Sequence, residues 1–284
     1  MFDSKPTTAY ILSVVIVFLS ITASAGGLLF NNLYQDNAFV TAVWRGNDLV
    51  TIFAAVPILI AVIIFSMRGS QHAQLIWFGM LDYTLYNFAF YLFGAAFNGF
   101  FLIYTALVAL SIAALIFGLL KIDVRGIVQK FRQATPTKWI SAYMLFTAVG
   151  LTAVYVLQSV RYIFTSQVPN IIERTGHITS VVPALDLTLL VPWIILGAVW
   201  LWRRQPWGYI ITAILAVKGT VYTLALTAAS LSASRAGYTE SSSEVPLWAV
   251  LSMGFLAASA LLLANLRKSH SPGRQSGAPF TPVN

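Results

Sequence analysis

Cysteine is absent from this 284-residue chain, and histidine occurs only three times. The lack of thiols excludes disulfides, thiolate metal sites and cysteine nucleophiles. The histidines, His72, His177 and His270, fall outside the apolar runs and on both sides of the predicted membrane. They cannot share one metal ion, which argues against histidine-based membrane hydrolases, desaturases and haem proteins. We therefore expect no metal site and no cofactor.

Motifs that carry enzyme chemistry are also missing. The sequence contains no glycine-rich phosphate loop, no HExxH and no GxSxG. It has no paired carboxylates of the kind that hold Mg²⁺ for lipid-phosphate transfer. These absences favour a protein that is not an enzyme.

Long apolar runs dominate what remains. Apolar residues make up 58% of the chain and charged residues only 9%, a composition typical of membrane proteins. Eight runs reach roughly the 20 residues that cross a bilayer: Ala9–Phe30, Leu49–Met67, Ala73–Gly94, Gly99–Leu120, Trp139–Val160, Val182–Trp202, Trp207–Leu231 and Pro246–Leu266. We predict an all-α integral membrane bundle of eight transmembrane helices forming one domain, 1–268. The polar tail, 269–284, is predicted to be disordered.

Basic residues indicate the orientation of the bundle. One set of connecting segments carries twelve of them: Lys5, Arg68, Lys121, Arg125, Lys130, Arg132, Lys138, Arg203, Arg204, Arg267, Lys268 and Arg274. The other set carries four: Arg45, Arg161, Arg174 and Arg235. Because positive residues are retained in the cytoplasm, both termini are predicted to be cytoplasmic. The net charge of +8 is thereby explained as a topology signal, and no nucleic-acid partner is expected.

The first run has a second interpretation. Lys5, the apolar core Tyr10–Ile21 and the triplet Ala23-Ser24-Ala25 resemble a signal peptide with its cleavage site. Cleavage would leave seven spans. The run continues to Phe30, however, and the charges of every later loop agree with an uncleaved helix, so eight spans are favoured.

The segment 121–138 joins two sets of four runs. Val124, Ile127, Val128 and Phe131 share one helical face, which predicts a short amphipathic helix on the inner leaflet that ends at Pro136. Its basic residues, Arg125, Lys130 and Arg132, are expected to contact anionic lipid. The alternative is a simple connecting loop.

Two charges stand inside the apolar runs. Asp82 lies about 14 Å deep and Lys218 about 16 Å deep, at 1.5 Å per residue, so both fall near the middle of a core of about 30 Å. Each would cost about 2.5–3.5 kcal/mol if it faced lipid. Matching depths and opposite charges predict that they face one another. They form either a proton- or ion-linked site or a buried pair that fixes helix packing.

Polar residues accompany both charges. Tyr86 and Asn87 follow Asp82 on one broad side of its helix, and Tyr222 lies one turn beyond Lys218. We assign Asp82, Tyr86, Asn87, Lys218 and Tyr222 to a substrate- or ion-binding site. Interhelical hydrogen bonding is the alternative explanation, and for the hydroxyl groups it is the favoured one.

Asp48 and Asp186 stand at the expected outer ends of the second and sixth runs. An aspartate there is predicted to cap the helix and to interact with its dipole. An outer entry site for ions is the alternative.

The two runs also begin alike, as Asp48-Leu49 and Asp186-Leu187. An arginine stands fourteen residues before Asp82, and another stands fourteen residues before Lys218. These matches are compatible with two four-helix halves related by an axis along the membrane normal. Coincidence among generic apolar helices explains them equally well.

Two stretches carry a resemblance to known sequences. The run 86–98 (YNFAFYLFGAAFN) and the later run 203–209 (RRQPWGY) resemble a group of uncharacterised prokaryotic multi-pass membrane proteins. The resemblance covers most of the helical region and implies a prokaryotic inner membrane, but no activity. From the residues themselves, the leading hypothesis is a small transporter or ion/proton-translocating protein. The alternative is a non-catalytic membrane subunit or sensor whose buried charges only specify packing.

Overall fold

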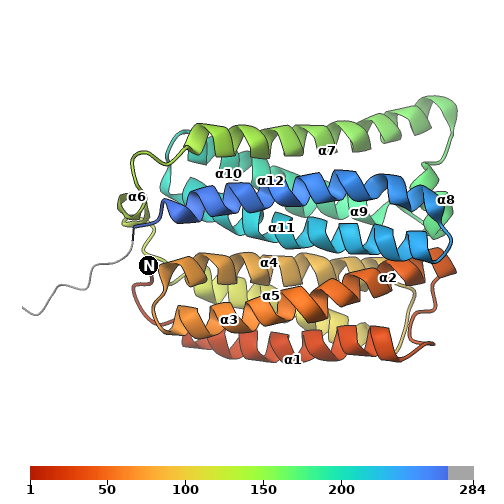
Figure 1. Ribbon diagram of the computed structural model, residues 1–284, viewed down its shortest axis with the longest axis horizontal. Helices are drawn as coiled ribbons and strands as arrows, with labels where there is room; N and C mark the ends of the chain where they lie inside the picture. The colour runs from red at the N-terminus through yellow and green to blue at the C-terminus, as the bar shows by residue number, and fades with distance from the viewer. Residues whose placement is uncertain (268–284) are drawn as a thin grey trace, which may run out of the picture.

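The computed structural model describes residues 1–267, and these form helices and connecting segments with no strand beyond two isolated bridges. The α-helices run nearly parallel to one long axis (Figure 1). Their bounds are α1 Thr7–Leu29, α2 Ala38–Val50, α3 Val56–Met67, α4 Gln71–Gly94, α5 Phe101–Leu119, α6 Ile127–Lys130, α7 Thr137–Thr165, α8 Asn170–Thr175, α9 Val181–Leu185, α10 Val191–Trp202, α11 Pro206–Arg235 and α12 Val245–Ala264. The predicted tail, 269–284, lies outside the described residues.

Within residues 1–267, seven helices are long and apolar enough to cross a membrane. They are Thr7–Leu29, Ala38–Met67, Phe101–Leu119, Thr137–Thr165, Val181–Trp202, Pro206–Arg235 and Thr239–Ala264. The third predicted span, α4, is long enough at 24 residues but is not among them. Asp82, Asn87 and several tyrosines make it more polar, which a helix surrounded by other helices tolerates.

Two of the seven helices are interrupted in the same way. A π-helical segment, η1 Thr51–Ala55, joins α2 to α3, and another, η2 Asp186–Leu190, joins α9 to α10. Each is followed by a proline, Pro57 or Pro192. Proline lacks an N–H group and its ring collides with the carbonyl four residues earlier, so a wider π turn relieves the strain. The helix after each π segment has 12 residues, and the second residue beyond it has a positive φ in both cases.

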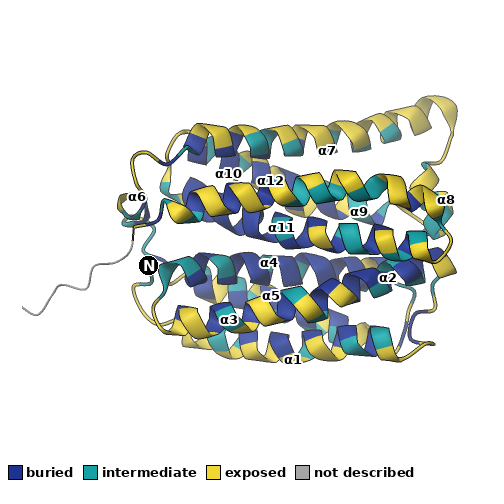
Figure 2. Ribbon diagram, in the orientation of Figure 1, coloured by how far each residue is buried: buried dark blue, intermediate teal, exposed yellow. Residues whose placement is uncertain are grey.

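The centre of the bundle is formed by α4 and α11, which pack on one another. Helices α3 and α5 pack on α4, whereas α2, α10 and α12 pack on α11. Figure 2 shows buried residues concentrated along these two central helices. At the crossing of α2 and α11 the backbones approach closely, because a Cβ on Gly46 would lie 2.5 Å from the Ala228 carbonyl oxygen.

The first helix is an integral part of this packing. It lies against α5 and α3, and its buried Ser13 accepts a 3.0 Å hydrogen bond from the Trp77 indole of α4.

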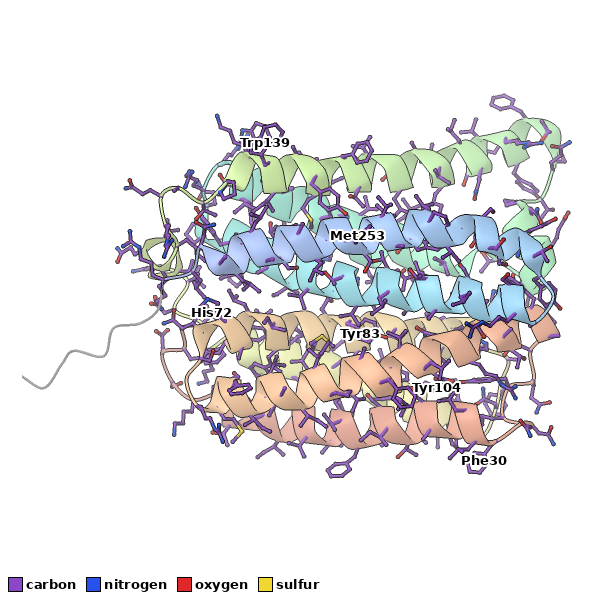
Figure 3. All side chains as sticks on the ribbon, viewed as in Figure 1. Phe30, His72, Tyr83, Tyr104, Trp139 and Met253 are labelled. Carbon is purple, nitrogen blue, oxygen red and sulfur yellow. The ribbon has the colours of Figure 1, made fainter. Side chains whose placement is uncertain are left out.

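The outer surface of the bundle is apolar. Phe164 is 82% exposed, Trp139 79% and Leu102 75%, and Figure 3 shows Phe30 and Trp139 extending away from the helices. Exposed apolar side chains over this whole surface are typical of contact with lipid. With the seven apolar helices, they identify a multi-pass membrane protein.

The connector 121–138 differs from the amphipathic helix predicted for it. Before α7 begins at Thr137, only the four residues of α6 are helical, so the predicted helix reaching Pro136 does not form. Ile127 and Phe131 are buried, and the Phe131 ring stacks on Tyr209 with 4.5 Å between centroids. The apolar face therefore packs under the end of the bundle. Pro136 ends no helix here, because it is the N-cap residue of α7.

Asp123 stabilises the fold of this connector. Its carboxylate accepts a 2.9 Å hydrogen bond from the Gly126 N–H and pairs with Lys130 at 3.4 Å. The Gly126 hydrogen bond is the main reason that the Asp123 pKa lies below its ordinary value. The Asp123 N–H donates to the Met1 carbonyl, and the Arg267 N–H donates to the Lys130 carbonyl. The first residues and the end of α12 therefore share one end of the bundle.

Candidate functional site

Asp82 and Lys218 meet across the central helix pair. Asp82 of α4 places its Oδ2 atom 3.9 Å from the Nζ atom of Lys218 on α11. The Lys218 side chain is 1% exposed and the Asp82 side chain 18%. The two charges therefore face one another in the interior, as their matching depths predict.

Tyr86 extends this pair toward a second carboxylate. The Lys218 ammonium lies 3.9 Å from the centroid of the Tyr86 ring, a cation–π contact. The Tyr86 hydroxyl donates a hydrogen bond to Asp186 Oδ1, and Tyr155 donates to Asp186 Oδ2 at 2.7 Å. Tyr222 meets the Tyr86 ring edge-on, with 4.7 Å between centroids. This cluster thus holds two carboxylates and one ammonium.

The two charged atoms of the pair lack hydrogen bonds. Among residues 1–267, neither Asp82 Oδ2 nor Lys218 Nζ makes a hydrogen bond. Buried polar groups are normally satisfied, because an unpaired one costs about 1–3 kcal/mol. Free hydrogen-bonding capacity at a buried ion pair is therefore a feature that calls for a functional explanation.

A cavity of about 470 Å³ opens beside the pair. Its lining comes from α4, α5, α10 and α11, with one residue from η2. The lining is Asp82, Leu85, Tyr86, Leu115, Leu119, Leu189, Trp193, Leu196, Trp200, Trp207, Ile211, Ile214, Leu215 and Lys218. Apart from the charged Asp82 and Lys218 and the aromatic Tyr86 and tryptophans, these residues are leucine and isoleucine. The only formal charges in the lining thus lie at one place.

Asn87 belongs to a different cluster. Five residues along an α-helix turn the side chain by about 140°, so Asn87 lies on another flank of α4 from Asp82. Its Oδ1 atom accepts a 2.7 Å hydrogen bond from Asn47 of α2, and the same Asn47 amide donates to the Tyr91 hydroxyl at 3.2 Å. The structure therefore brings Asp82, Lys218, Tyr86 and Tyr222 together and places Asn87 elsewhere.

Asp48 is the centre of this second cluster. It accepts hydrogen bonds from Tyr34 at 2.5 Å and from Tyr91 at 2.9 Å. Burial and the neighbouring carboxylate raise the pKa of Tyr34, in the α1–α2 connection, above its ordinary value. The Tyr34 hydroxyl therefore keeps its proton and remains a donor. These bonds connect α2, α4 and the segment after α1.

The capping role predicted for Asp48 and Asp186 is wrong. Helix α2 begins at Ala38, and its N-cap is Asn37, which accepts a 2.9 Å hydrogen bond from the Val40 N–H. Asp48 lies in the last turn of α2, and Asp186 begins the π segment η2. Both carboxylates are buried, at 1% and 2% exposure. The alternative, an outer entry site for ions, stays a prediction.

Tyr155 has a role that no sequence signal indicates. It lies on α7 among apolar residues, at no distinctive spacing from any charge, and reaches Asp186 only through the tertiary packing.

Among residues 1–267, no three histidine, aspartate or glutamate side chains lie close enough to hold one metal ion. Comparison of the chain with family models, with curated proteins and with solved structures finds no match.

Proposed function

We propose that this chain is a small transporter or ion/proton-translocating protein that works through the Asp82–Lys218 pair. The observation that carries the proposal is an ion pair without hydrogen bonds, buried between the two central helices at the wall of a cavity. Ionisable residues within membrane spans mark ion and substrate pathways. A pair that served packing alone is expected to have its remaining hydrogen-bonding capacity filled.

Each residue of the site has a proposed role. Asp82, the more exposed partner, exchanges a proton or binds a cation from the cavity. Lys218 keeps its charge fixed or engages an anionic substrate, and the nearby Asp186 favours the first of these. Tyr86 and Tyr155 continue the polar row from the pair to Asp186. Tyr222 holds the Tyr86 ring in place.

The membrane arrangement is part of the same proposal. We propose α4 as an eighth span, shielded by its neighbours, within two four-helix halves. The matching π segments, Val-Pro steps and 12-residue helices support the two halves. Both termini are proposed to lie in the cytoplasm of a prokaryotic cell, with the protein in the inner membrane. Arg125, Lys130 and Arg132 are proposed to contact anionic lipid there.

A second candidate is a non-catalytic membrane subunit or sensor. The cluster around Asp48 favours it, because that carboxylate joins three parts of the chain through direct hydrogen bonds. If Asp82 and Lys218 served the same purpose, their loss would change stability and nothing else. Transport measurements on folded variants separate the two candidates.

We expect vesicles that contain the purified protein to take up protons when a potassium gradient and valinomycin set an inside-negative membrane potential. The pH-sensitive dye pyranine, enclosed in the vesicles, reports the uptake. Asp82→Asn is expected to reduce uptake to the level of protein-free vesicles, because the amide cannot exchange a proton. Asp123→Asn, which changes a surface carboxylate, is the matched control and keeps uptake. Helical circular dichroism and size-exclusion profiles verify that both variants are folded.

The same vesicles are loaded in parallel with sodium, potassium or chloride gradients, so that a coupled ion is detected as well. Uptake by wild-type protein that does not exceed protein-free vesicles for any of these ions would contradict ion translocation. Uptake unchanged in folded Asp82→Asn would contradict the role of the pair.

A further inference from the structure

The cavity beside Asp82 and Lys218 combines an apolar body with one charged end. Three tryptophans, Trp193, Trp200 and Trp207, and a set of leucines and isoleucines line the body. Its volume of about 470 Å³ lies within the range of about 300–1,000 Å³ typical of sites for one small molecule. An ion alone needs no such apolar space, so the shape points to a ligand with a hydrocarbon portion.

The charged end restricts the head group of that ligand. Lys218 only donates hydrogen bonds, and an ionised Asp82 only accepts them. A hydroxyl group does both, and it can bridge the two groups, whose Nζ and Oδ2 atoms are 3.9 Å apart. Both atoms are closed off from the cavity in this structure, so the bridge requires the Asp82 carboxylate to turn toward the cavity. An ammonium head would meet Lys218 directly. A carboxylate or phosphate head would meet Asp82 and lie near Asp186, which shares Tyr86 with the site.

The cavity walls indicate how such a ligand arrives. Helix α5 packs on α4, and α10 packs on α11, so the cavity lies between the two walls. Three residues of its lining are exposed: Trp193 by 50%, Leu189 by 41% and Trp207 by 37%. Such exposure at an apolar site would let a molecule dissolved in the bilayer enter sideways, between α5 and α10.

We propose that this cavity binds a neutral, hydroxyl-bearing amphiphile from the bilayer. Its apolar body lies among the tryptophans, and its hydroxyl group accepts from Lys218 and donates to Asp82. This ligand class rests on the proposed function in taking the Asp82–Lys218 pair as the substrate site. Binding itself is independent of whether the protein moves ions.

Three bromine-labelled probes with the same chain and different heads test the proposal: 11-bromoundecan-1-ol, 11-bromoundecanoic acid and 11-bromoundecylamine. Bromine quenches tryptophan fluorescence at contact, and the protein is held in phosphatidylcholine nanodiscs at neutral pH. With the probe concentration expressed per lipid, we expect saturable quenching by the alcohol at a concentration about tenfold lower than for the other two, the difference that one good hydrogen bond produces.

Two variants locate the site. Leu196→Phe fills the cavity wall and is expected to abolish the saturable quenching. Leu261→Phe, on the lipid-facing side of α12 at 47% exposure, is the matched control and keeps it. Equal, unsaturable quenching by all three probes, or quenching unchanged by Leu196→Phe, would overturn the site. Tighter binding of the acid or the amine would overturn the hydroxyl assignment.

The outcomes also separate this proposal from ion translocation. Saturable alcohol binding without ion flux retains the ligand site and rejects translocation. Asp82-dependent ion flux without selective alcohol binding retains translocation and rejects the ligand site.

Discussion

Lys218→Met is expected to lower the free energy of unfolding by about 3–5 kcal/mol, the cost typical of breaking a buried ion pair from one side. Methionine keeps an unbranched side chain, one atom shorter, but among residues 1–267 it removes the only ammonium near Asp82 and Asp186. It also removes the cation from the Tyr86 ring. Two carboxylates then remain in one interior without a positive charge. Denaturant unfolding in mixed micelles, followed by circular dichroism, measures the change.

A double variant isolates the contribution of the pair. Asp82→Asn with Lys218→Met removes both charges, and we expect it to recover most of the loss, because neutral replacements of buried pairs are often well tolerated. Additive losses in the double variant would mean that the two residues do not interact. A stable double variant without proton uptake would then assign the pair to transport rather than to packing.

Asp48→Leu is expected to cost about 2–5 kcal/mol, because two buried phenols lose their acceptor and each unpaired group costs about 1–3 kcal/mol. Tyr34 and Tyr91 donate to this carboxylate from different parts of the chain. Leucine has the same branched shape but bulkier methyl groups, so the nearly isosteric Asp48→Asn is needed to separate lost hydrogen bonds from overpacking. The same unfolding measurement applies, and proton uptake through the Asp82 site is expected to persist in the folded fraction.

Asp48→Asn is the conservative comparison. Its amide oxygen still accepts from one tyrosine, so the expected loss is smaller than for leucine. Glu173→Leu, which replaces an exposed carboxylate of α8, controls for loss of a surface carboxylate. Equal stability of Asp48→Leu and the wild-type protein would show that the cluster does not connect these helices.

The charge pair was predictable because helix geometry converts sequence distance into depth. Asp82 and Lys218 follow a basic loop at the same spacing, so equal depth could be inferred before any packing was known. Their contact at 3.9 Å follows once α4 and α11 become neighbours. The cavity was not predictable, since it depends on how α5 and α10 sit beside the central helices.

Other sequence-based predictions differ from the structure for identifiable reasons. The apolar run beginning at Leu49 hides the start of α2 at Ala38, because the intervening turns are amphipathic. Asp48 was therefore placed at a helix end instead of inside a 30-residue helix. Helical spacing places Asn87 and Asp82 on one broad side of α4, but the two residues face different helices. Asn87 meets Asn47 of α2, whereas Asp82 meets Lys218 of α11. The periodicity of the connector predicts an apolar face but does not show what covers it, and in the structure Phe131 of that face stacks on Tyr209.

The most direct test of the buried pair is a solid-state NMR distance measurement in lipid bilayers, with ¹⁵Nζ-labelled lysine and ¹³Cγ-labelled aspartate. The Asp123→Asn background removes Lys130–Asp123 at 3.4 Å, the other close lysine–aspartate pair among residues 1–267. In that background we predict dephasing from one close pair, consistent with the 3.9 Å Nζ–Oδ2 separation and lost in Lys218→Met. Absence of dephasing before Lys218 is replaced would contradict the pairing of Asp82 with Lys218.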